Sequence, residues 1–124
     1  MNGDMMKDLP LVDPAQMERL NEWGGAELKR KMIGLFLTHA VERLDQIREG
    51  VSAGSPEKAE TGAHTLKSSA GNVGAQRVQM LAQDAESLAE AGKLDELKAL
   101  LPSLEEEFHA ACGALKNVLE GVEE

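Results

Sequence analysis

The chain has 124 residues, a length that fits a single domain able to bury about two-thirds of the surface of its unfolded form. Its composition is 42% hydrophobic but only 2% aromatic, so aliphatic side chains and methionine must fill the core, which favours packed helices over a sheet. A formal net charge of -9 argues against a nucleic-acid partner, because binding to phosphates needs a basic face.

The sequence contains no apolar run of about 18 residues and no charged segment followed by an apolar one, so neither a membrane-spanning helix nor a secretion signal is expected. We expect a cytoplasmic protein that contacts no membrane and acts as a monomer. The single cysteine, Cys112, cannot form an internal disulfide. Its place between Ala111 and Gly113 is typical of a small core residue.

Residues 1–12 show no clear period and predict a flexible N-terminal arm, followed by one helical domain over 13–124. A short helix is expected over 14–23, because Asp13 and Pro14 have the form of an N-cap and a first helical residue. The glycine pair that follows ends this helix, since glycine accepts the left-handed conformation.

Four longer amphipathic helices follow, from 26 to about 51, from 56 to near 71–74, from 75 to 91, and from 94 to 120. Pro102 removes a backbone donor and crowds the preceding turn, so a kink or a break is expected there. Short connections place successive helices antiparallel. The sequence therefore predicts an all-α fold, an up-and-down antiparallel four-helix bundle with a short additional N-terminal helix.

The second of these longer helices, from 56 to near 71–74, carries the candidate site. Its inward seam, with steps of four and three residues, consists of Ala59, Ala63, Leu66, Ala70 and Val73. His64 lies about 135° from the centre of this seam, so we expect it to be exposed. An exposed neutral imidazole can attack an electrophilic phosphorus, and Lys67, one turn on, can screen the phosphoryl charge. Ser68 and Gly71 lie on the same side and leave room for a partner.

The string His-x-Leu-Lys-x-Ser that starts at His64, with a Gly-Ala pair ten and eleven residues later, resembles the signature of histidine-containing phosphotransfer domains. These are the HPt modules of bacterial and fungal phosphorelays. On this resemblance His64 is the phosphorylated histidine, Lys67 the lysine beside the phosphate, and Ser68 the small residue, often glycine, that clears the site. Gly74 is the glycine at the helix end. The resemblance covers about 11–119 and implies the same bundle, one short helix followed by four long ones, with the histidine midway along the third helix of the chain.

The resemblance also implies a reaction and its partners. His64 accepts a phosphoryl group from the aspartate of a receiver domain, or from a sensor or hybrid histidine kinase, and passes it to the aspartate of a response-regulator receiver. The chain is then a phosphoryl carrier without turnover of its own. It needs no cofactor, because Mg²⁺ is supplied by the partner receiver domain.

Other interpretations of the same residues were weighed. Glu106 and His109 have the spacing of half a di-iron site, but the sequence contains no second Glu-x-x-His to complete it, so His109 is expected at the surface or its boundary. A non-catalytic helical interaction module, in which the motif is coincidental, is the main alternative to phosphotransfer. Glu60, one turn before His64, is a candidate for holding a ring nitrogen, although a solvated carboxylate is the simpler interpretation.

Overall fold

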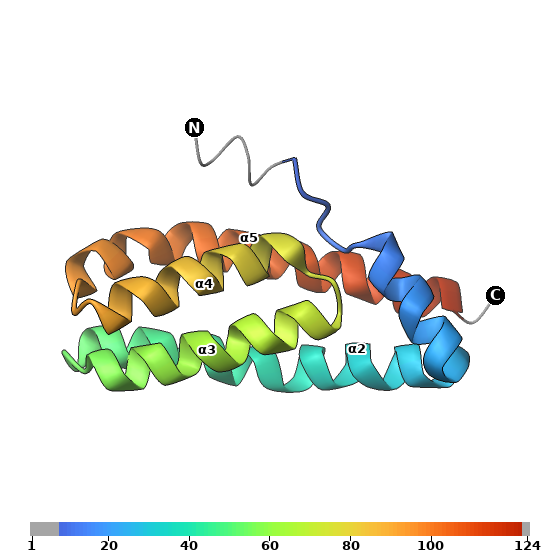
Figure 1. Cartoon of the computed structure of the whole chain (residues 1–124), viewed down its shortest axis with the longest axis horizontal. Coiled ribbons are helices and arrows are strands. Elements are labelled where there is room, and N and C mark those ends of the chain that lie inside the picture. Colours follow the sequence, from blue (N-terminus) through green and yellow to red (C-terminus); the bar gives the residue numbers. More distant parts are fainter. Residues whose placement is uncertain (1–7, 123–124) are drawn as a thin grey trace.

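The structure is a computed structural model that describes residues 8–122. The helices are α2 (Pro14–Ser52), α3 (Pro56–Asn72), α4 (Gln76–Glu90) and α5 (Leu94–Val122). Helix α3 packs between α2 and α4, and α5 packs against α4 and α2, so the helices form a closed ring of neighbours (Figure 1). The predicted all-α four-helix bundle is confirmed. Within the described residues, no helix combines the length and the apolar character needed to cross a bilayer.

Helix α2 consists of two arms that meet at Gly25, whose φ of 69° and ψ of -163° are not helical. The first arm corresponds to the predicted short helix, and its N-cap is Asp13, whose side chain accepts a hydrogen bond from the Ala15 amide at 3.1 Å. This arm lies at one end of the bundle (Figure 1). The Asp13 amide donates to the Gly74 carbonyl at 2.8 Å, which ties the arm to the turn between α3 and α4.

The described part of the predicted N-terminal arm, residues 8–12, contacts α4. The Leu9 carbonyl accepts a hydrogen bond from Nε of Arg77 at 2.8 Å. Nη1 of the same guanidinium lies 3.5 Å from Oε2 of Glu107, a buried residue of α5. Arg77 therefore links this segment to both α4 and α5. The rest of the arm, residues 1–7, lies outside the described residues.

Helix α3 begins after Ser55, whose hydroxyl oxygen accepts a hydrogen bond from the Lys58 amide at 3.3 Å. The predicted inward seam of this helix is confirmed, because all five of its side chains are buried. Gly62 faces α2, and a Cβ atom there would lie 3.0 Å from the carbonyl oxygen of Arg43. The backbones of α2 and α3 can therefore approach closely beside the candidate site.

The core is aliphatic, with Phe36 of α2 and Phe108 of α5 in contact at a ring-centroid distance of 5.8 Å. Helix α5 continues through Pro102, so of the kink or break predicted there, the break does not occur. Pro102 is exposed, and the carbonyl that loses its helical donor can be hydrated. The buried side chains of Leu97 and Leu104, on either side of the proline, hold the helix against the core.

Candidate functional site

His64 lies in the middle of α3, on the side away from the buried seam. Its side chain is 62% exposed, which confirms the prediction from the helical periodicity. One turn later, Ser68 is exposed and Lys67 is half-buried. The structure thus brings these predicted residues together on one helix and places the imidazole where a partner can reach it.

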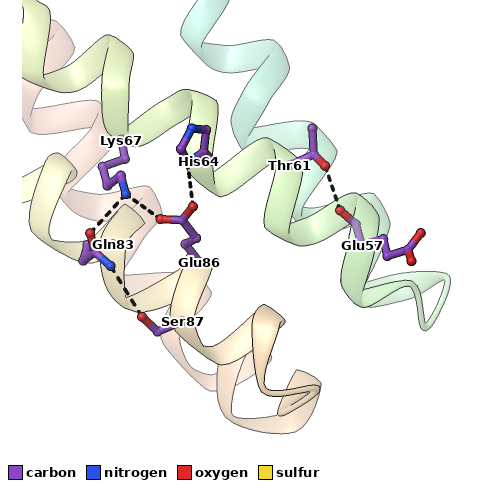
Figure 2. A network of polar contacts seen from close by, with 7 residues as sticks. All are labelled: Glu57, Thr61, His64, Lys67, Gln83, Glu86 and Ser87. Atoms are coloured by element: carbon purple, nitrogen blue, oxygen red, sulfur yellow. Dashed lines mark hydrogen bonds and ion pairs between the residues drawn. The ribbon is translucent and has the colours of Figure 1, made fainter.

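The imidazole is held by Glu86, a carboxylate of α4 that the sequence analysis missed. Nδ1 of His64 lies 2.6 Å from Oε2 of Glu86, which reaches from α4 towards the ring (Figure 2). Glu60, the partner considered from the sequence, does not take this place. It lies on the rim of a shallow depression that it forms with Thr61, Thr65, the imidazole and Glu86.

Lys67 also contacts α4. Its Nζ donates to Oε1 of Glu86 at 2.6 Å and to Oε1 of Gln83 at 3.1 Å. The amide nitrogen of Gln83 in turn lies 3.5 Å from the hydroxyl oxygen of Ser87 (Figure 2). Glu86 therefore uses one oxygen for the imidazole and the other for the ammonium, and bridges the two functional side chains of α3.

The charge on Glu86 decides which ring nitrogen carries the proton. The hydrogen bond from Lys67 is the largest cause that lowers the pKa of Glu86; burial opposes it, and the contact with His64 adds to it. Glu86 is therefore ionised at neutral pH and has no proton to donate, so Nδ1 of His64 must be the donor in this bond. In the neutral ring Nε2 then carries the lone pair. No residue within 8–122 forms a hydrogen bond with Nε2.

The two predicted glycines have different surroundings. Gly71 is half-buried and faces α4, and a Cβ atom there would lie 2.9 Å from Nε2 of Gln79. Gly74 lies in the turn after α3 with a φ of 73°, a conformation that favours glycine. A Cβ atom at Gly74 would also come within 3.1 Å of Asp13. Gly74 thus stands at the helix end, as predicted, and Gly71 has a neighbour within the chain itself.

An apolar groove runs between α2 and α3 beside the site. It is lined by Met32, Leu35, Phe36, His39, Ser69, Asn72 and Val73. Leu35 is 45% exposed, and the other large hydrophobic side chains with high exposure, Trp23 and Val41, also lie on α2. An exposed apolar surface of this kind is typical of a site where another protein binds.

The described residues contain no group of three or more side chains suited to hold a metal ion. His109 is exposed on α5, as predicted, and its ring contacts Phe108 edge-on with a centroid distance of 6.0 Å. Cys112 lies at the edge of the core, and burial raises the pKa of its thiol. Neither residue belongs to the site around His64.

A family model described as the Hpt domain matches residues 31–123, which include α3, α4, α5 and the part of α2 from residue 31 on. The chain belongs to the Hpt domain family. It is a histidine phosphotransfer protein of a phosphorelay, and proteins of this family are phosphocarriers. None of the curated proteins compared with this chain matches its sequence.

Solved structures agree with this Hpt fold. The chain is similar to the crystal structure of histidine-containing phosphotransfer protein B from Pseudomonas aeruginosa PAO1, with a TM-score of 0.83 and 24% identity over 90% of this chain and 96% of that one. It is also similar to the structure of a candidate histidine-containing phosphotransfer protein from rice, with a TM-score of 0.78 and 20% identity over 91% and 83% of the two chains.

Glu86 and Gln83 are the site residues of this Hpt domain that the sequence analysis did not identify. One signal for them was available. In an antiparallel helix pair, residues at similar distances from the connecting turn face each other. His64 lies ten residues before Gly74 and Glu86 twelve after it, and Glu86 directly follows Ala85, which is part of the buried stripe of α4.

Proposed function

We propose that His64 accepts a phosphoryl group on Nε2 from the aspartyl phosphate of one receiver domain and passes it to the aspartate of another. The observation that carries this proposal is the hydrogen bond from Nδ1 of His64 to the ionised Glu86. This contact keeps the proton on Nδ1 and leaves a nucleophilic nitrogen on an exposed ring. The carboxylate also holds the orientation of the ring.

The transfer balances without the loss of a proton. The lone pair of Nε2 attacks phosphorus, the nitrogen–phosphorus bond forms, and the bond from phosphorus to the aspartyl oxygen breaks. The aspartate leaves as a carboxylate, and the ring gains a positive charge that it shares with the Nδ1–H group. That group donates to Glu86, so the carboxylate stabilises the charged product. The same events in reverse deliver the phosphoryl group to the next aspartate.

Lys67 supplies positive charge beside the reacting ring. In-line phosphoryl transfer places negative charge on the oxygens of the transferred group, and catalysis depends on positioning and on neutralising this charge. Lys67 has the place for this role, one turn from His64 on the same helix. The described residues offer no metal site of their own, and we propose that Mg²⁺ belongs to the receiver domain.

The receiver docks on the groove between α2 and α3 in this proposal. This groove combines apolar side chains of α2 with Ser69 and Asn72 of α3, just past His64. An apolar centre with a polar rim is typical of transient protein interfaces. Chemical-shift mapping with a receiver should show perturbations on α2 and α3. Perturbations confined to α5 would contradict this placement.

The remaining parts of the proposal concern the system around the protein. The partners are receiver domains of response regulators and a sensor or hybrid histidine kinase. The protein acts as a cytoplasmic monomer and carries the phosphoryl group without turnover of its own. Size measurement in solution, cell fractionation and an assay for release of inorganic phosphate test these three statements separately.

The central test is labelling by a phosphorylated receiver. We expect His64 to take up the label in a linkage that is labile in acid and stable in alkali, and His64→Gln to abolish it. His109→Gln is the matched control, since His109 is exposed on α5, outside the docking groove, and should be dispensable; His39 lines the groove, so His39→Gln should keep the label on His64 but also tests docking. If His64→Gln were labelled at the wild-type rate, the proposal would be wrong. Binding of a receiver without any labelling would favour the non-catalytic interaction module.

A further inference from the structure

The ammonium group of Lys67 is directed towards α4. Both of its hydrogen-bond partners, Glu86 and Gln83, lie on that helix (Figure 2). The Lys67 side chain is only 25% exposed, whereas that of His64 is 62% exposed. The edge of the imidazole that contacts α4 carries Nδ1, not the nitrogen that takes the phosphoryl group. In this state the lysine is therefore bound to α4.

The bridge through Glu86 allows the lysine to leave without disturbing the histidine. Oε2 of Glu86 accepts from His64 and Oε1 accepts from Lys67, so the two contacts use different atoms. A phosphoryl group on Nε2 brings up to about two negative charges and three acceptor oxygens to the same face. It is a stronger partner for an ammonium group than one carboxylate oxygen and one amide oxygen.

We infer that Lys67 changes partners during phosphotransfer, and that Gln83 is a positioning residue that holds the lysine on α4 until His64 is phosphorylated. This inference rests on the proposed function of His64. In the unphosphorylated protein, Glu86 and Gln83 bind the ammonium group of Lys67. In the phosphorylated protein, Lys67 binds the phosphoryl oxygens, and Glu86 keeps its hydrogen bond to Nδ1 of His64. Nothing in the reaction's covalent balance changes, because only hydrogen bonds are exchanged.

The contact between Lys67 and Gln83 predicts whether a substitution of Gln83 speeds up or slows down the phosphorylation of His64. Gln83 binds the lysine in the resting protein, and its amide nitrogen is directed at Ser87, which leaves the carbonyl oxygen for Lys67. A contact that exists only before the reaction stabilises the starting state and slows the chemical step. Removal of this contact should therefore speed up phosphorylation. Removal of a contact that Lys67 also makes in the transition state would slow it.

The kinetic test uses the full chain and phosphoramidate, a small donor that releases ammonia and needs no docking surface. Gln83→Leu keeps the size of the side chain and suits an exposed helical position, so folding should not suffer. We expect it to speed up phosphorylation of His64 by about two- to tenfold, the range for one modest hydrogen bond. Gln79→Leu, also exposed on α4, is the matched control and should leave the rate unchanged. An unchanged or reduced rate in Gln83→Leu would overturn the inference.

A spectroscopic test follows the exchange directly. When phosphoramidate phosphorylates His64 in the wild-type protein, the NMR signals of the Gln83 side-chain amide and of Lys67 Nζ should shift, and those of the Gln79 amide should not. If His64 is phosphorylated and neither signal moves, the partner exchange is wrong while the proposed function stands. If His64 takes up no phosphoryl group from phosphoramidate or from a receiver, the proposed function fails and the inference fails with it.

Discussion

Replacing Glu86 should impair transfer far more than folding. Glu86→Ala removes the acceptor of the Nδ1 proton and the anionic partner of Lys67, two contacts of 2.6 Å each. Without the acceptor, the ring can rotate, and its proton can sit on Nε2, which then has no lone pair for the attack. Carboxylates that orient a functional histidine in metal sites are worth about 10- to 100-fold, and we expect a loss of this size in the transfer rate.

Two opposing effects meet in this variant. Loss of Glu86 also frees Lys67, which by itself would speed up the reaction, but the lysine only screens charge, whereas Nε2 must have its lone pair for any reaction. The net effect should therefore be a loss. Glu86→Gln keeps an acceptor for Nδ1–H and removes the negative charge, so its loss should be smaller than that of Glu86→Ala. The free energy of unfolding should fall by less than about 1 kcal/mol, since the imidazole is largely exposed and the contact with Lys67 is only partly buried.

The assay measures the initial rate of transfer from a phosphorylated receiver to each variant, together with urea unfolding. The pH dependence gives a second check. Because the pKa of Glu86 is lowered in the folded protein, its stabilising contribution is complete above the ordinary carboxyl range and is lost as the pH falls through the lowered pKa. The stability difference between wild type and Glu86→Gln should thus be present at pH 7 and vanish in strong acid. A wild-type transfer rate in Glu86→Ala would refute the assignment of the proton to Nδ1.

Three further substitutions test the other side chains of the site. Lys67→Ala should slow transfer by an amount on the order of 1–3 kcal/mol with an almost unchanged melting curve; an unchanged rate would leave Lys67 with no part in transfer beyond its contacts with α4. Ser68→Leu should reduce transfer from a receiver at least about tenfold and affect phosphoramidate less, because misplacement by about 1 Å costs roughly 100-fold; equal losses with both donors would contradict the clearance role. Gly74→Ala should destabilise the fold by about 1–3 kcal/mol in urea unfolding, since its φ is 73° and a Cβ atom would meet Asp13; wild-type stability would show that the turn relaxes.

The tertiary structure changes what a substitution of Gly71 would test. From the sequence, Gly71 clears space for a partner, and that role stays a prediction. The structure adds that a side chain there must first displace the amide of Gln79 on α4. A variant such as Gly71→Arg therefore perturbs the packing of α3 on α4 as well as the docking surface. Ser68, which is exposed, gives the cleaner test.

The sequence by itself determined the features that depend on one helix at a time. The steps of three and four residues defined the buried seam of α3, and the same geometry placed His64 outward, because a helix fixes the direction of every side chain around its axis. The cap at Asp13 followed from local hydrogen bonding in the same way. At Pro102 the sequence left a kink or a break open, and the helix is unbroken because packing of α5 on the core outweighs the local loss of one hydrogen bond.

Only the tertiary structure decided which side chains of α4 meet the reactive face of α3. Glu86 is 22 residues from His64, and Gln83 is 16 residues from Lys67. Their contacts depend on the rotation and the relative height of the two helices, which the turn at Gly74 and the packing of the buried stripes set together. The helical period fixes the direction in which a side chain points but not its position along the axis of the neighbouring helix. Which nitrogen of the reactive histidine carries the proton depends on that axial position.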